Sequence, residues 1–199
     1  MRSDISNNLI HLVKNNVFDN AGSIFFQILK DEKLNGGIGF IKDGYRCVCF
    51  SETPIHEIAR MFTLENQTNI RYRPFGIMVS KEWLYAQGGR PVVYQPDNEY
   101  LNLPEDMRYR HVRYEPDNDK DFTWEREWRI KTDSLILDPD ETTLIVPNKA
   151  WIVKLREEHY NTLRMAVSSL GGTALGYIQR YKWHFIALED LGIKVFDYD

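Results

Sequence analysis

The chain has 199 residues, of which 43% are hydrophobic and 13% aromatic. This is enough apolar surface for one sizeable core, so we expect residues 1–199 to form a single domain. The formal net charge of −4 excludes an overall basic field that would hold nucleic acid. No apolar run reaches the length of a transmembrane helix, and the polar start has no signal-peptide pattern. We therefore expect a cytoplasmic protein without membrane contact.

The first half of the chain predicts strands and helices separated by turn residues. The turn sequence at 35–37 ends the first helix, and Ser80 is suited to cap the last one. Between them, Thr53 is suited to the N-cap and Pro54 to the first turn of a helix. The expected elements are a strand or short helix at 8–14, a helix at 23–31, a buried strand at 45–50, a helix at 54–62, a strand at 75–79 and a helix at 81–86.

The second half contains a long stretch, residues 95–121, that is weak in regular structure. Its prolines and acidic residues predict a surface excursion with a basic middle. The other expected elements are strands at 90–94, 123–130, 143–146, 150–153 and 193–196, and an amphipathic helix at 155–170. This mixed order of short strands and few helices predicts an α+β fold with a mixed or antiparallel sheet.

Two groups of residues have an ordinary structural interpretation. Cys47 and Cys49 are too closely spaced for an ordinary disulfide and too few for a zinc site, so we interpret both as small core residues of a buried strand. Arg108, Arg110 and Arg113 alternate with aromatic residues, which is typical of the exposed face of a strand. The alternative for these arginines is a platform for bases or phosphates.

A pair of carboxylates stands in the expected strand at 123–130. Side chains alternate between the faces of a strand, so Glu125 and Glu127 would share one face, with Trp124, Arg126 and Trp128 on the other. Like charges side by side cost free energy unless a partner or a substrate offsets them. The pair is therefore a candidate site for chemistry on a cationic or electron-poor group. An exposed strand with ordinary arginine partners would explain the same pattern without chemistry.

Two further residues have a setting that suits a site. His11 interrupts an apolar stretch, which fits either a hydrogen-bonded histidine at a strand edge or a functional one. Ser51 directly follows a buried strand, where it would start a helix or present its hydroxyl to a cleft. The sequence has no P-loop and no Gly-x-Ser-x-Gly motif, and its histidines lack metal-ligand spacing, so we expect no metal.

Three blocks in order along the chain resemble the ADP-ribosyltransferase superfamily, whose members bind NAD in a cleft of a split β-sheet. The blocks are the early His11, the CFSETP sequence at 49–54 and the EREWR sequence at 125–129. The second and third blocks together are also similar to a bacterial abortive-infection family that includes AbiG-i. DNA-modifying transferases of the DarT type are a more distant likeness. The resemblance implies a split mixed or antiparallel sheet with a few flanking helices.

The resemblance also implies roles for individual residues, with NAD as co-substrate. Glu127 would be the catalytic glutamate, and Glu125 would orient or deprotonate the incoming nucleophile. His11 would hydrogen-bond NAD, and Ser51 would order the nicotinamide ribose with Thr53 nearby.

The first position of the motif departs from the family. The superfamily patterns begin with Arg-Ser-Glu or His-Tyr-Glu, whereas this chain would combine His11, Ser51 and Glu127. Arg46, at the start of the cysteine strand, is the candidate substitute for the arginine. Arg129 could offset the carboxylates.

Three hypotheses follow. The first is a mono-ADP-ribosyltransferase that acts as a toxin or phage-defence effector on a nucleic acid or protein acceptor. The second is a non-catalytic binding module, such as the antitoxin partner of an abortive-infection system, which would bind a cognate toxin protein. The third is a nucleic-acid-binding protein that uses the arginines at 108–113 and would show steep salt dependence.

Overall fold

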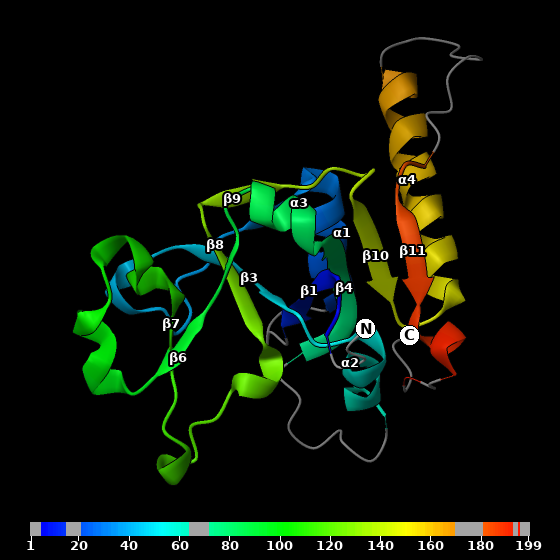
Figure 1. Cartoon of the computed structure of the whole chain (residues 1–199). Coiled ribbons are helices and arrows are strands. Elements are labelled where there is room, and N and C mark those ends of the chain that lie inside the picture. Colours follow the sequence, from blue (N-terminus) through cyan, green and yellow to red (C-terminus); the bar gives the residue numbers. More distant parts are fainter. Residues whose placement is uncertain (1–4, 15–20, 64–71, 170–180, 193–194, 196–199) are drawn as a thin grey trace.

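The computed structural model of the protein describes residues 5–14, 21–63, 72–169, 181–192 and 195 (Figure 1). Side chains are described in these ranges except for 162–169. No helix in the described ranges is both long enough and apolar enough to cross a membrane.

A seven-stranded sheet of mixed orientation forms the centre of the molecule, in the order β11-β10-β4-β1-β3-β8-β5. Neighbouring strands are antiparallel except for β10 and β11, which are parallel. The strands are β1 (Asn8–Lys14), β3 (Cys47–Ser51), β4 (Tyr72–Ser80), β5 (Arg90–Pro91), β8 (Glu127–Lys131), β10 (Thr142–Val146) and β11 (His184–Ala187).

Two small sheets extend this frame. They pair β2 (Lys33–Asn35) with β9 (Ser134–Ile136), and β6 (Val93–Gln95) with β7 (His111–Arg113). The α-helices are α1 (Ala21–Asp31), α2 (Ile55–Met61), α3 (Lys81–Ala86) and α4 (Lys149–Ser169). The 3-10 helices are η1 (Lys42–Gly44), η3 (Asp97–Asn102), η4 (Glu105–Arg110), η5 (Pro116–Asn118), η6 (Thr123–Glu125) and η7 (Leu188–Leu191). The α+β class and the mixed sheet with few helices are as expected from the sequence.

Local sequence signals place several element ends correctly. Residues 8–14 form a strand rather than a helix. The Ser80 hydroxyl accepts the backbone N–H of Trp83 at 3.1 Å, so the predicted cap of α3 is confirmed. The expected excursion at 95–121 contains three 3-10 helices and the strand β7, and with β6 it makes a lobe beside the main sheet (Figure 1).

Other expectations are wrong. Residues 150–153 are not a strand but the first turns of α4, where Trp151 and Leu155 are buried while Val153 is 55% exposed. A short apolar run cannot be assigned by periodicity alone, and here helical spacing decides. The expected strand at 90–94 divides at Val92 into β5 and β6, which belong to different sheets.

Three strands were not anticipated, namely β2, β9 and β11. They have three or four residues each, which is too short for a clear alternating pattern. The expected strand at 193–196 lies outside the described residues, apart from Val195.

Apolar side chains cover both faces of the main sheet. On one face, α1, α3 and α4 bury a cluster that includes Phe25, Phe75 and Leu84. On the other face, α2 and η7 cover a smaller cluster around Ile10 and Ile58. The α2 cluster covers only part of its face. Beyond it, the same face of β3 and β8 carries polar side chains.

The pairing between β1 and β3 is short. β1 shares six registered residue pairs with β4 on one side, but only the pair Ile10–Ser51 with β3 on the other. The two halves of the sheet therefore meet through a short seam, in contrast to the continuous ladder between β3 and β8.

Replacement of Phe75 by Ala should lower the free energy of unfolding by about 3–5 kcal/mol, because the side chain is fully buried between α1 and α4. The matched control is Phe40→Ala, since Phe40 is 85% exposed and its loss should change stability by less than about 0.5 kcal/mol. Urea unfolding of both variants measures the difference. Equal effects would mean that the core lies elsewhere.

Candidate functional site

The three sequence blocks meet on neighbouring strands at the centre of the sheet. Ser51, at the end of β3, pairs with Ile10 of β1 on one side and with Glu127 of β8 on the other. His11 is the next residue along β1. These residues, 40 to 116 positions apart in the chain, thus lie on three adjacent strands. By strand alternation, the His11 side chain shares the face of Leu9 and Phe50, whereas Ser51 and Glu127 lie on the other face.

The strand that carries the two glutamates starts later than expected. Residues Thr123–Glu125 form the 3-10 turn η6, and Arg126 has a left-handed backbone with φ of 44°. Only Glu127 begins β8, so the predicted placement of Glu125 and Glu127 on one strand face is wrong. The turn is favoured locally because the Asp121 carboxylate accepts both the backbone N–H and the hydroxyl of Thr123, at 2.9 and 2.6 Å.

Hydroxyl groups of the CFSETP block hold this turn in place. The Ser51 hydroxyl donates to the carbonyl of Glu125 at 2.6 Å and accepts the backbone N–H of Thr53 at 3.1 Å. The Thr53 hydroxyl donates to the carbonyl of Trp124 at 2.7 Å. Thr53 is therefore not the N-cap of α2: Pro54 occupies that position, and no side chain caps the helix. Both hydroxyls fix the backbone around Glu125.

Glu127 forms a nearly buried, two-pronged ion pair with Arg129. The arginine Nε and Nη2 donate to the two carboxylate oxygens at 2.8 and 3.0 Å. The side chain of Glu127 is only 11% exposed and that of Arg129 only 7%. Burial lowers the pKa of Arg129, but the hydrogen bond and the charge of Glu127 outweigh it, so the pKa is raised overall. The expectation that Arg129 offsets a carboxylate agrees with this geometry.

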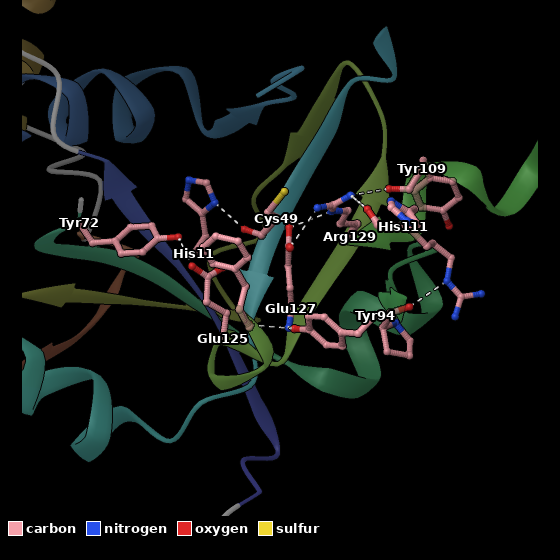
Figure 2. Close-up of polar contacts among 12 residues, drawn as sticks. His11, Cys49, Tyr72, Tyr94, Tyr109, His111, Glu125, Glu127 and Arg129 are labelled. Carbon is pink, nitrogen blue, oxygen red and sulfur yellow. Dashed lines mark hydrogen bonds and ion pairs between the residues drawn. The ribbon is translucent and has the colours of Figure 1, made fainter. Parts of the chain in front are cut away.

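Glu125 has a different environment. It is partly buried, and its Oε1 accepts the hydroxyl of Tyr72 from β4 at 3.0 Å (Figure 2). The two glutamates therefore point to different partners, although one residue separates them. Tyr72 was missed by the sequence reasoning, because nothing local signals a contact across 53 positions.

His11 bridges the seam between β1 and β3. Its Nδ1 lies 2.8 Å from the carbonyl of Cys49, and because a carbonyl only accepts, Nδ1 carries the proton. Burial lowers the pKa of His11 to about 4, so the ring is neutral near pH 7. The contact fits the structural alternative, a hydrogen-bonded histidine at a strand edge. The imidazole takes the place of a ladder bond where β3 diverges.

The cysteine thiols are not activated. Burial raises the pKa of Cys47 to about 11, and burial with the adjacent Glu127 carboxylate raises the pKa of Cys49 further. Only the thiolate is a strong nucleophile, so neither cysteine suits covalent catalysis. Cys47 is buried, as expected of a core residue, whereas Cys49 is only partly so.

Arg46, a predicted NAD-binding residue, lies away from this cluster. Arg46 precedes β3 at the end opposite Ser51, and it pairs with Asp133 at 3.3 Å in an exposed position. The structure thus does not bring Arg46 to the other predicted residues.

The basic strip is not a regular strand. Arg108 and Arg110 belong to η4 and donate to the carbonyls of Leu103 and Pro91, while Arg113 in β7 pairs with Glu115. Arg108 thus bonds within the excursion and Arg110 ties it to β5, whereas the pair of Arg113 with Glu115 is local.

A second, partly buried polar contact involves the opposite face of β8. The Glu52 carboxylate accepts the indole N–H of Trp128 at 2.8 Å and pairs with Lys81 at 2.6 Å. This contact anchors the CFSETP block to α3. Within the described residues, no group of three or more His, Cys, Asp or Glu side chains is arranged to hold a metal ion.

Loss of the Ser51 hydroxyl should loosen η6. Ser51→Ala removes one donated and one accepted hydrogen bond, so we expect a loss of about 1–2 kcal/mol in the free energy of unfolding. The control is Ser23→Ala at an exposed position of α1, where alanine is the better helix former and stability should not fall. Chemical denaturation measures both variants. A Ser51→Ala protein as stable as the control would show that the Ser51 hydroxyl does not hold η6 in place.

His11 should make stability fall in acid. The ring is neutral in the folded protein down to about pH 4, whereas it gains a proton near pH 6.5 once unfolded. Protonation therefore favours the unfolded chain, and stability present above pH 6.5 is lost as the pH falls from 6.5 to 4.

The measurement is the free energy of unfolding against pH for wild type and His11→Gln. The stability difference between the two should shrink by a few kcal/mol across that window. Parallel curves would show that His11 is protonated as readily in the fold as outside it.

Comparisons with protein-family models, with curated proteins and with solved structures find no match to this chain.

Proposed function

We propose that this protein is an NAD-dependent mono-ADP-ribosyltransferase, acting as a toxin or phage-defence effector on a nucleic acid or protein acceptor. One observation carries the proposal. The blocks that resemble the superfamily lie on the adjacent strands β1, β3 and β8, with Ser51 and Glu127 paired directly and His11 next to the residue that pairs with Ser51. Glu125 stands beside them on a turn that two hydroxyl groups of the middle block hold in place.

The proposed reaction uses the two carboxylates differently. The bond between C1′ of the ribose and the nicotinamide nitrogen breaks, and its electron pair leaves with neutral nicotinamide. The Glu127 carboxylate stabilises the positive charge that develops on the ribose, and its clamp to Arg129 fixes its orientation beforehand. Glu125 takes the proton of the acceptor nucleophile as that group attacks C1′.

A second candidate function is a non-catalytic binding module, such as an antitoxin. The observation that favours it is the same ion pair: both oxygens of Glu127 already accept from Arg129, which leaves the carboxylate largely occupied. The exposed Trp124 and Phe122, 47% and 37% accessible, would then serve as contacts to a protein partner.

The test of the first function is nicotinamide release from NAD by wild type and Glu127→Gln, with total nucleic acid and cell lysate as acceptors. We expect the variant to lose at least about 100-fold in rate, because an amide cannot stabilise the cationic ribose. Glu57→Gln is the matched control, since its carboxylate pairs with Arg60 on the surface of α2. It should retain the wild-type rate.

A second variant guards against a folding defect. Removing the charge of Glu127 leaves Arg129 buried without its partner, which costs about 3–5 kcal/mol. Glu125→Gln leaves that pair intact, and it should slow transfer to the acceptor more than simple release of nicotinamide. Absence of both NAD binding and turnover in wild type would reject the transferase and favour the binding module.

A further inference from the structure

Arg129 connects Glu127 with the excursion at 95–121. While Nε and Nη2 hold the glutamate, Nη1 donates to the carbonyls of Tyr109 and His111 at 2.8 and 2.9 Å. Those carbonyls lie in η4 and β7, within the lobe beside the main sheet. One guanidinium group therefore spans two parts of the molecule (Figure 2).

The lobe also reaches Glu127 through its backbone. The Tyr94 hydroxyl in β6 accepts the N–H of Glu127 at 3.0 Å and donates to the carbonyl of Phe122 at 3.3 Å. The N–H of Val92 donates to the carbonyl of Glu127 at 3.0 Å. The start of β8 is thus held by the Tyr94 hydroxyl of the lobe and by the main chain of Val92, directly before β6.

Because Arg129 is buried, each of its hydrogen bonds costs free energy to break. Arg129 is only 6% exposed, so water cannot replace a lost partner of its guanidinium group. Four hydrogen bonds engage it, two to a carboxylate and two to backbone carbonyls. A displacement of the backbone at Tyr109 or His111 must therefore move Arg129, and Glu127 with it.

We propose that Arg129 is a positioning residue that makes the placement of the Glu127 carboxylate depend on the conformation of the 95–121 lobe. This inference rests on the proposed transferase function for its catalytic consequence. A ligand that shifts η4 or β7 would then change the rate of transfer without touching NAD.

The experiment compares Arg129→Lys with wild type. Lysine keeps the positive charge but lacks the planar fork, so it cannot hold Glu127 and both carbonyls together. We expect kcat for nicotinamide release to fall by about 10- to 100-fold, while KM for NAD changes by less than about threefold. A purely structural role would lower the amount of folded enzyme and leave kcat per folded molecule unchanged.

Arg113→Lys is the matched control. Arg113 also lies in the lobe, but it is exposed, and its guanidinium group pairs with Glu115 two residues away and does not reach Glu127. This variant should keep the wild-type kcat and KM. Wild-type kinetics in folded Arg129→Lys would overturn the inference.

A measurement on wild type covers the case in which Arg129→Lys does not fold. The backbone N–H of Tyr114 donates to the carbonyl of Gln95 inside the lobe, and that of Glu127 donates to Tyr94. If Arg129 couples the two, native-state hydrogen exchange of these amides should agree within about threefold at low urea. Exchange of Tyr114 more than about 100-fold faster than that of Glu127 would mean that the lobe opens independently, and the inference fails.

The two proposals fail separately. Wild type that neither binds nor turns over NAD rejects the transferase, while the exchange data still decide whether the lobe and Glu127 are coupled. Active wild type with unaltered Arg129→Lys kinetics rejects the coupling and leaves the transferase in place.

Discussion

The buried ion pair between Glu127 and Arg129 is the constraint on which the rest of the site depends. Two charges taken out of water lose several kcal/mol of hydration each, and their attraction repays this only when every remaining donor is satisfied. Here the backbone of the lobe satisfies them, through the carbonyls of Tyr109 and His111. Arg129 therefore links the backbone of the lobe to the Glu127 carboxylate at the start of β8.

The ion pair between Glu127 and Arg129 has a consequence for each candidate function. For a transferase, a carboxylate fixed before the substrate arrives needs no reorganisation as charge develops, which is the physical basis of preorganised catalysis. For a binding module, the same clamp is a structural device that sets the shape of a recognition surface. The difference lies in Glu125, whose Oε1 accepts the hydroxyl of Tyr72 and which is not part of the two-pronged pair with Arg129.

Sequence reasoning succeeded where signals are local and failed where they are not. The mixed α+β class and the Ser80 cap follow from spacing and from single-residue preferences, whereas the pattern at 8–14 fits a strand or a short helix equally. The start of β8 does not, because an alternating pattern of glutamate and aromatic residues looks like a strand whether or not Arg126 turns left-handed. Tyr72 could not be found either, since its contact with Glu125 depends on how β4 is placed by the whole sheet.

Strand β8 makes a polar contact on each of its faces. On one face Glu127 and Arg129 satisfy each other, and on the other the indole of Trp128 binds Glu52, which also pairs with Lys81. A slip of one residue along β3 would exchange the two faces and send both charges into the apolar cluster against Phe50. The register of the strand is thus fixed by polar contacts as well as by hydrophobic ones.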